Sequence, residues 1–326
     1  MSDHYIFSNG RLKRKENTIY FQTSDGVQKA LPVERVDNFH IFGEVDLNSK
    51  LFTLLTNYGV CLHFYNYYGY YTGTYYPRTK NISGFTVVQQ SAHYLDPQKR
   101  YYLASAFVNS GIHHMLRNLR RYKEKTQSYQ DIIKVEMMQI PNRNTIHELM
   151  GIEGRVRQVY YRSFNEILKS DFHFDKRNKK PPTDPLNALI SFGNSLMYTT
   201  VLSEIYKTVL DPTISFLHEP SSKRFSLSLD LAEIFKPLLV DSLIISVVNN
   251  RTIKKEHFED VEGMVFLNDE GKKRFIKEWE KKLATTIKHR ILKRKVSYRR
   301  FIRLECYKII KHLLGDESYR PLKAWW

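Results

Sequence analysis

The stretch TIHELMGIEGRVRQVYYRSFNEILK, residues Thr145–Lys169, decides the fold class of the chain. Its apolar residues return mostly three or four positions apart, which is the spacing of one face of an amphipathic helix. They are Ile146, Leu149, Met150, Val156, Val159, Tyr160, Phe164 and Ile167. Because such a face is stable only when other elements cover it, the stretch predicts a helical domain around it.

Helical patterns continue on both sides of this stretch. Upstream, Asp96-Pro97 opens a helix that is predicted to run to about residue 125. Downstream, the basic segment DKRNKKPP, Asp175–Pro182, interrupts the pattern, and Asp184-Pro185 starts the next helix. A further helix is predicted over Leu227–Asn249, with a kink at Pro237. The last hundred residues are also predicted to be helical.

The N-terminal part is typical of a β-rich domain. Four short runs of aromatic and β-branched residues are predicted strands: Tyr5–Phe7, Thr18–Phe21, Val36–Phe42 and Val60–Phe64. Between the last two, a short helix is predicted, with Asp46 as its N-cap and Gly59 as its C-cap. The fold class is therefore α+β. A small β-rich domain is predicted at residues 1–82, a linker at 83–94 and a larger all-α domain at 95–326.

Composition excludes several classes of protein. The chain has 326 residues, of which 42% are hydrophobic and 13% aromatic, so wholesale disorder is excluded. The mean hydropathy of -0.47 and the lack of a long apolar run predict no transmembrane helix. We expect no signal peptide in the first residues, and two cysteines are too few for a disulfide framework. We expect a reduced, cytoplasmic protein.

Positive charge is concentrated near the C-terminus. The chain has a formal net charge of +17, and Lys272–Arg303 holds fourteen Lys and Arg residues but only Glu278 and Glu280 as acids. Apolar residues recur within this run, so we interpret it as a folded helical surface with a buried face. So few counter-charges favour a surface that binds a polyanion, through the phosphate backbone rather than base edges. A membrane surface is the less favoured partner.

Three segments combine acids with a histidine in a way that a hydrolytic or transesterifying metal site would use. Glu153 lies in a helical pattern between two glycines, His218 lies in a predicted loop, and Asp230 and Glu233 are three positions apart on one helix. Carboxylates with one imidazole suit Mn²⁺ or Mg²⁺ and leave positions for water and phosphate oxygens. Each of these signals is weak when taken alone.

Taken together, the order and spacing of several segments resemble the CRISPR-associated integrase family of spacer acquisition. The segments are Leu31–Val33 with Ile41–Gly43, Met150–Gly154, Tyr160-Tyr161, PPTDPLNALISFG at Pro181–Gly193, Leu217-His218, Asp230–Glu233 with Phe235–Pro237, and Tyr319–Pro321. The sequence departs from the commonest family pattern at Ser228-Leu229, where many members have an aliphatic residue followed by tyrosine.

The resemblance implies a homodimer, joined largely through the β-rich domains, and one divalent ion, Mn²⁺ or Mg²⁺, in each subunit. Glu153, His218 and Glu233 are its implied ligands, and Asp230 is an auxiliary acid that could exchange roles with Glu233. The implied partner is a small ferredoxin-like CRISPR-associated protein. The implied reaction is attack by the 3′-hydroxyl of a DNA fragment on a phosphodiester of the CRISPR repeat.

Basic residues in three places are the candidates for binding DNA. They are Arg117, Arg120 and Arg121; Lys223 and Arg224 beside His218; and Lys288, Arg290, Lys293, Arg294, Lys295, Arg299 and Arg300. Two other functions stay open at this point. One is a non-catalytic scaffold that binds nucleic acid through its basic face, and the other is a stand-alone nuclease for branched or single-stranded DNA.

Overall fold

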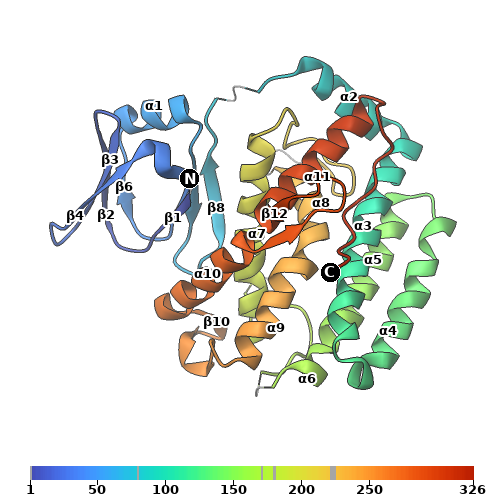
Figure 1. Cartoon of the computed structure of the whole chain (residues 1–326). Coiled ribbons are helices and arrows are strands. Elements are labelled where there is room, and N and C mark those ends of the chain that lie inside the picture. Colours follow the sequence, from blue (N-terminus) through green and yellow to red (C-terminus); the bar gives the residue numbers. More distant parts are fainter. Residues whose placement is uncertain (1, 79–80, 170–171, 179–180, 221–224) are drawn as a thin grey trace. The chain divides into compact units, whose positions relative to one another are not determined.

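The computed structural model describes residues 2–78, 81–169, 172–178, 181–220 and 225–326 (Figure 1). The chain divides into two compact units, Met1–Ile82 and Ser83–Trp326. The first unit is rich in strands, and the second is mostly helical, as the α+β prediction requires.

Unit 1 contains two four-stranded sheets. One has the strand order β1-β5-β7-β8, with β1 at Ser2–Ile6, β5 at Val36–Ile41, β7 at Cys61–Tyr65 and β8 at Tyr71–Tyr75. The other has the order β4-β3-β2-β6, with β4 at Gln28–Pro32, β3 at Thr18–Thr23, β2 at Gly10–Lys15 and β6 at Val45–Asp46. A 3₁₀ turn at Val33–Arg35 precedes β5. Each predicted strand overlaps one of these strands.

Helix α1, Ser49–Tyr58, covers the core of this unit with fully buried leucines such as Leu51 and Leu55. Its predicted N-cap, Asp46, is wrong. The cap is Asn48, whose side chain accepts a hydrogen bond from the backbone N–H of Leu51. The predicted C-cap is confirmed, because Gly59 has φ +68°, a left-handed conformation that glycine adopts without strain.

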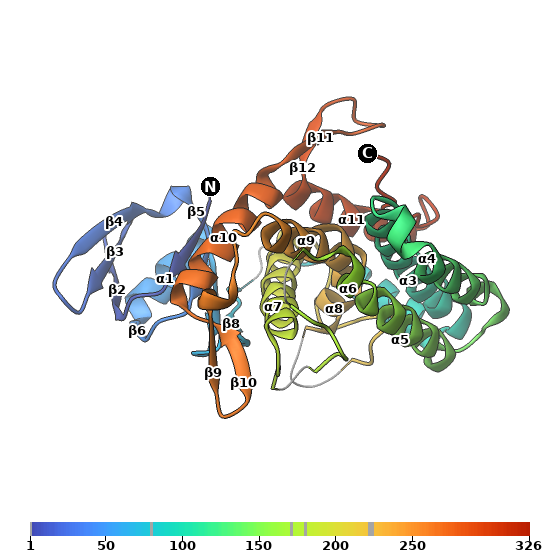
Figure 2. The same cartoon turned by 90° about the horizontal axis from the view of Figure 1, so that it is seen from below.

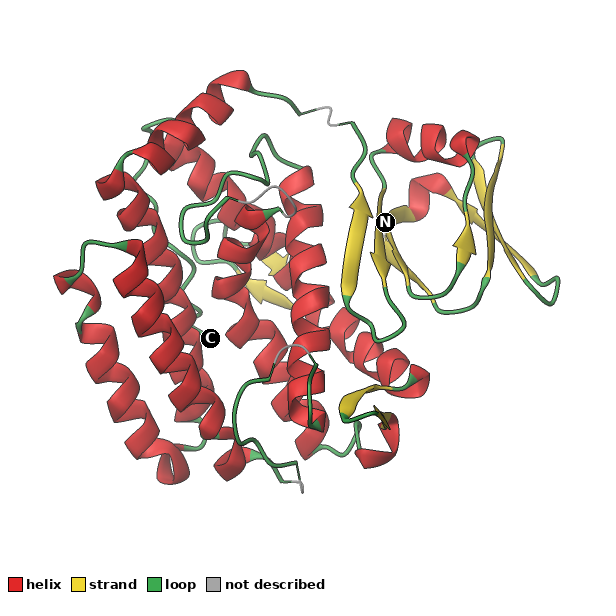
Figure 3. Cartoon of the chain, turned by 180° about the vertical axis from the view of Figure 1, so that it is seen from behind, coloured by secondary structure: helices red, strands yellow, loops and turns green. Residues whose placement is uncertain are grey.

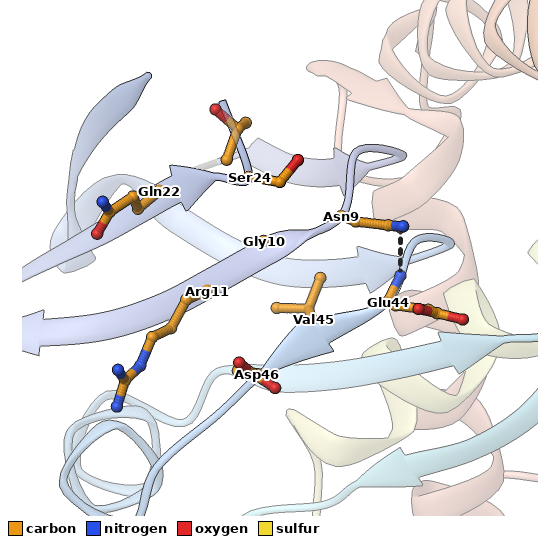
Figure 4. Close-up of a pocket in the computed structure, with 9 residues that line it drawn as sticks. Asn9, Gly10, Arg11, Gln22, Ser24, Glu44, Val45 and Asp46 are labelled. Atoms are coloured by element: carbon orange, nitrogen blue, oxygen red, sulfur yellow. Dashed lines mark hydrogen bonds between the residues drawn. The ribbon is translucent and has the colours of Figure 1, made fainter. Parts of the chain in front are cut away.

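A hollow of about 610 Å³ lies in unit 1 beside β2, β3 and β6 (Figure 4). The backbone N–H of Glu44 donates to Asn9 Oδ1 at its edge, over 2.9 Å. Its carboxylates, Glu44 and Asp46, are exposed to solvent. Catalytic acids are usually desolvated or paired with other groups, so this hollow is not a candidate active site despite its size.

Unit 2 is built from helices (Figure 3). They are α2 Gly84–Leu95, α3 Pro97–Arg120, α4 Lys123–Met138, α5 Ile146–Arg162, α6 Phe164–Ile167, α7 Pro185–Tyr206, α8 Ser226–Phe235, α9 Ser242–Asn249, α10 Asp269–Ala284 and α11 Tyr298–Leu313. Short 3₁₀ turns lie at Ile140–Asn142 and Lys255–His257. Residues 84–94, most of the predicted linker, belong to helix α2, which packs against α3.

Helix α7 lies at the centre of unit 2 and is buried on all sides, so it presents no polar face to solvent. The predicted kink at Pro237 takes the form of a π-helical segment, Lys236–Asp241, between α8 and α9. Proline lacks a backbone N–H and cannot continue the α-helical hydrogen bonds, so the wider turn falls where the sequence requires it.

Two short hairpins correct the prediction of an all-α domain. Strands β9, Phe258–Val261, and β10, Met264–Leu267, form one antiparallel pair. Strands β11, Thr286–Lys288, and β12, Lys295–Ser297, form the other, between α10 and α11 (Figure 2). The basic run Lys272–Arg303 is therefore two helices separated by a hairpin, and not one helical surface.

Candidate active site

Helices α5 and α8 supply the carboxylates of the site. Thr145 caps α5 by accepting a hydrogen bond from the backbone N–H of Glu148, and the apolar face of the helix is buried at Ile152 and Val156. Glu153 follows Ile152 at the edge of this face, with 21% of its side chain exposed. Helix α8 is buried almost throughout, so Asp230 lies wholly inside the protein. A carboxylate in such a place needs specific partners.

Helix α3 fixes the C-terminal end of α8. A Cβ atom at Gly111 would lie 2.9 Å from the backbone oxygen of Glu233, so only glycine allows this close approach. One turn further on, His114 Nδ1 donates to the carbonyl of Ile234 over 2.8 Å. After another turn, Asn118 Nδ2 donates to the carbonyl of Pro237 over 2.7 Å. These contacts set the position from which Glu233 projects.

Asp230 organises the loop that carries His218. Its Oδ2 accepts from the backbone N–H groups of Phe216, at 2.6 Å, and Leu217, at 2.9 Å. Its Oδ1 accepts from the backbone N–H of His218 at 2.9 Å and lies 2.8 Å from His218 Nδ1. Because Nδ1 is committed to Asp230, Nε2 is the ring nitrogen that can face a ligand. The contacts give Asp230 the part of a positioning acid.

The three predicted ligands line one cavity of about 510 Å³ in unit 2. The cavity is lined by Met150, Glu153, Gly154, Arg157, Gln158, Tyr161, Phe174, Lys176, Arg177, Asn194, His218, Glu233 and Lys236. Glu153, His218 and Glu233 are 65 and 15 residues apart along the chain, and the fold brings all three to this one place. Asp230 lies behind His218 and is not part of the lining.

Two cations that sequence reasoning missed hold the carboxylates. The guanidinium of Arg157 contacts Glu153 Oε1 through Nε and Glu233 Oε2 through Nη2. Lys236 Nζ donates to Glu233 Oε1 over 2.7 Å. Arg157 is four residues after Glu153, and Lys236 is three after Glu233, which are the spacings of ion pairs along a helix. That signal was present in the sequence.

Burial raises or lowers the pKa of groups in the wall of the cavity and behind it. Desolvation, together with the nearby positive charge of Arg157, lowers the pKa of Lys236 to about 7. Desolvation also raises the pKa of Asp241 to about 7. The hydroxyl of Tyr161, whose pKa burial raises, donates to Asp241 Oδ1 over 3.4 Å. The site is thus a desolvated cluster of acids and bases, which is typical of active sites.

The donor set fits a hard divalent cation. Two carboxylates, one imidazole nitrogen and an amide oxygen lie around the same cavity. The amide oxygen, Asn194 Oδ1, is buried without a hydrogen-bond partner among the described residues. Among the described residues, no three Asp, Glu, His or Cys side chains are close enough together to hold a metal ion as they stand. Arg157 lies between the carboxylates of Glu153 and Glu233 and contacts both.

The predicted DNA-binding residues fall into different surroundings. Lys223 and Arg224 lie outside the described residues. The guanidinium of Arg117 donates to the backbone oxygen of Trp326, so it holds the C-terminus, whereas Arg120 and Arg121 are exposed. The hairpin residues Lys288, Arg290, Lys293, Arg294 and Lys295 are exposed. Arg299 pairs with Glu280, and Arg300 lies over the ring of Tyr307.

None of the helices among the described residues has the length and apolar composition needed to cross a membrane.

A desolvated cavity with paired acids and an imidazole, in a helical domain with an exposed basic hairpin, is typical of an enzyme that acts on nucleic acid phosphodiesters. The family model "CRISPR associated protein Cas1" matches residues 4–281. A CRISPR-associated endonuclease Cas1 from Clostridium perfringens is 60% identical over 99% of both chains. The chain belongs to the Cas1 family of CRISPR-associated endonucleases, which confirms the resemblance found in the sequence.

Solved structures agree with this assignment. A Cas1 protein from Thermotoga maritima is 41% identical and has a TM-score of 0.89, covering 98% of this chain and 100% of its own. Two structures with 17% identity share the fold. One is a casposase bound to integration product, with a TM-score of 0.86 over 100% of this chain and 94% of its own. The other is a Cas6-RT-Cas1–Cas2 complex, with a TM-score of 0.87 over 100% of this chain and 36% of that one.

Proposed function

We propose that the chain is a metal-dependent DNA endonuclease and integrase that inserts short foreign DNA fragments into a CRISPR array. The observation that carries this proposal is the cavity in which Glu153, His218 and Glu233 meet. Membership of the Cas1 family supports the nuclease activity. The likeness to a casposase bound to integration product supports the integration step.

The proposed reaction is a transesterification. The oxygen of a fragment's 3′-hydroxyl forms a bond to the phosphorus of a repeat phosphodiester, and the bond from phosphorus to the 3′ oxygen of the repeat strand breaks. The proton lost by the attacking hydroxyl balances the proton gained by the leaving oxygen, so no high-energy cofactor is needed. Water in place of the 3′-hydroxyl would give simple nicking at the same site.

Glu153, Glu233 and Nε2 of His218 would hold a Mn²⁺ or Mg²⁺ ion. The ion would polarise a phosphoryl oxygen and lower the pKa of the attacking hydroxyl. Asp230 keeps His218 in the tautomer and orientation that leave Nε2 free for this role. Arg157 would leave the carboxylates when a divalent cation takes their charge, and its guanidinium could then bind a phosphate oxygen.

The assembly belongs to the same proposal. We expect a homodimer formed largely through unit 1, together with a small ferredoxin-like CRISPR-associated partner. The solved Cas6-RT-Cas1–Cas2 complex, which shares this fold, supports a partner of that kind. Light scattering of the chain alone, and then with the candidate partner, measures both steps. A monomer at micromolar concentration, or a pair of proteins that elute separately, would refute this part.

The catalytic part is tested with a repeat-containing plasmid, a DNA fragment with free 3′-hydroxyls, the partner subunit and Mn²⁺. Glu153→Gln, His218→Ala and Glu233→Gln should each lower nicking and strand transfer by about 100-fold or more, because each removes a group that would hold charge in the transition state. DNA binding, measured in EDTA by fluorescence anisotropy, should persist. Glu136→Gln is the matched control. It removes another carboxylate from a pair with arginine, Arg155, outside the cavity.

The other two functions give different results in this experiment. A stand-alone nuclease would nick DNA in a manner that depends on the three residues but would never yield strand-transfer products. A non-catalytic scaffold would bind DNA with a steep dependence on salt and would show no metal-dependent nicking that the three substitutions abolish. Either result would overturn the integrase proposal.

A further inference from the structure

The hairpin of β11 and β12 carries a loop that the active site does not explain. It stands out from the helices of unit 2 (Figure 2). Lys288 and Lys295 are the last paired residues of the two strands. Beyond them, the backbone N–H of His289 donates to the carbonyl oxygen of Arg294 over 2.9 Å. The residues Arg290–Lys293 therefore form the tip of the hairpin, and Lys293 closes the turn at φ +54°.

Contacts at the base of the tip give it a defined shape. His289 Nδ1 accepts from the backbone N–H groups of Ile291, at 3.2 Å, and Leu292, at 3.1 Å. The His289 ring stacks on the buried Phe301, with ring centroids 5.4 Å apart. The guanidinium of Arg290 lies 4.7 Å from the centre of the Trp325 ring. The tip is thus anchored to α11 and the C-terminus.

This ordered tip exposes aliphatic surface inside a basic surrounding. Ile291 is 83% exposed, more than any other large apolar side chain in the described part of the chain, and Leu292 is 41% exposed. The exposed bases Lys288, Arg290, Lys293, Arg294 and Lys295 flank it. No acidic residue occurs from 281 to 304. A tip that faced only water would be expected to carry polar or glycine residues instead.

The other hairpin of unit 2 shows that an exposed aliphatic residue alone does not make this pattern. Val261, at the end of β9, is 44% exposed. Its neighbours Glu259, Asp260 and Glu262 are acidic, so this hairpin would repel a polyanion. Both hairpins expose an aliphatic side chain, but its charged neighbours are acidic at Val261 and basic at Ile291. Val261 therefore serves as the control position.

We propose that the β11–β12 hairpin is a DNA-deforming wedge, in which Ile291 inserts between neighbouring base pairs of duplex DNA. The five Lys and Arg side chains that flank it bind phosphates. Aliphatic wedges of this kind unstack a base step and bend the duplex in architectural DNA-binding proteins. A rigid tip suits this task because it does not have to be ordered on binding. The inference rests on the proposed function only in that its partner is DNA. It assigns the hairpin an action on DNA beyond phosphate contact.

The test uses the full chain and a set of duplexes that each carry 2-aminopurine at one position, because its fluorescence rises when the base loses its stacking. EDTA keeps metal-dependent cleavage out of the measurement. The wild-type chain should raise the emission at one or a few positions. Ile291→Ser should lose most of that increase while the Kd for DNA rises by about threefold or less, since the phosphate contacts remain. Val261→Ser should behave as wild type.

The Lys and Arg residues that flank Ile291 give an independent readout. Lys293→Ala and Lys295→Ala should each weaken binding at all duplexes alike and lower the slope of log K against log salt by about one. Ile291→Ser should leave that slope unchanged, because no ion pair is removed. Circular dichroism of each variant confirms that the chain is folded.

The outcomes separate this proposal from the one on which it rests. If wild type and Ile291→Ser raise the emission equally, or if no position responds although the chain binds DNA, the wedge is refuted and the proposed function stands. If the wild-type chain binds no duplex, both fail. If Ile291→Ser instead weakens binding to phosphatidylserine vesicles and leaves the DNA signal intact, the tip is a membrane anchor and the wedge is refuted.

Discussion

Lowering the pH from about 7.5 to about 5 should cost the protein about 2 kcal/mol of unfolding free energy through His114 alone. His114 is 0% exposed, and its two ring nitrogens have different partners. Nδ1 donates to the carbonyl of Ile234 over 2.8 Å, and Nε2 accepts from the backbone N–H of Ala324 over 3.0 Å. Protonation would add a hydrogen to Nε2, where it would face the backbone N–H of Ala324.

The pKa of His114 follows from this arrangement. Desolvation, with a smaller contribution from the positive charges of Arg117 and Lys323, lowers it from 6.5 to about 3. The unfolded state therefore binds a proton below about pH 6.5, whereas the folded state does not do so until about pH 3. Because the folded-state pKa is the lower one, the stability that the neutral ring contributes is fully present above pH 6.5 and is lost as the pH falls toward 3. Between about pH 7.5 and 5 the loss is about 1.5 pKa units, or about 2 kcal/mol.

Urea unfolding at several pH values measures this loss when wild type is compared with His114→Gln. Glutamine does not titrate, so the difference between the two pH slopes isolates His114 from the other histidines. The variant should be less stable near pH 7.5, because it loses at least one of the two hydrogen bonds. Between pH 7.5 and 5, its unfolding free energy should fall by about 2 kcal/mol less than that of the wild type. His113→Gln is the matched control, since that neighbouring ring is only partly buried.

Two results would refute this reasoning. One is an equal pH slope in wild type and His114→Gln. The other is an NMR titration in which the ring carbon signal of His114 moves between pH 7.5 and 5, because that would place its pKa in the ordinary range. A larger slope in the wild type together with a silent NMR signal is the expected combination.

Four further substitutions test the site and the helices that hold it. Asp230→Asn should lower Mn²⁺ affinity and nicking by about 10- to 100-fold, because it loosens the loop of His218; isothermal titration and a nicking assay measure the two effects. Arg157→Ala should tighten Mn²⁺ binding, read from the loss of the free-ion EPR signal, because the cation that competes for both carboxylates is gone; weaker binding would contradict this. Gly111→Ala should lower the unfolding free energy by about 1–3 kcal/mol, since its Cβ would meet a backbone oxygen of α8. Gly154→Ala, a helical glycine with open space around the added Cβ, should raise it by about 1 kcal/mol, and thermal unfolding compares the two.

Much of the fold could be predicted because local patterns agree with it. The strand runs of unit 1, the helix start at Asp96-Pro97 and the irregular turn at Pro237 each depend on a few neighbouring residues. The hairpin of β11 and β12 could not be predicted in this way. Its tip has no glycine or asparagine, and its left-handed position is Lys293, so the sequence lacks the usual turn signal.

The residues of the candidate site also differ in how well the sequence predicts their roles. Glu153, His218 and Glu233 were predicted as one set from residue type and from the resemblance to the family, and the fold brings them to one cavity. The role of Asp230 depends on a loop that folds back over it, and no spacing rule gives the direction of its side chain. Arg157 was missed although its distance of four residues from Glu153 is a helical pairing distance.

Helix α3 shows why the contacts that hold the site are hard to predict from the sequence. Gly111, His114 and Asn118 are three and four residues apart, so they share one face, and that face holds α8. Ser110 and Arg117 lie on the adjoining face and bind backbone oxygens of the C-terminal segment, at Leu322 and Trp326. In the sequence these polar residues are typical of an exposed helix, because their partners lie more than a hundred positions away. These polar groups are satisfied by particular backbone atoms of the two segments, so a shift of α8 or of the C-terminal segment by one residue would leave several groups unpaired. The two faces therefore fix the register of α8, and with it the place of Glu233, more strictly than apolar packing would.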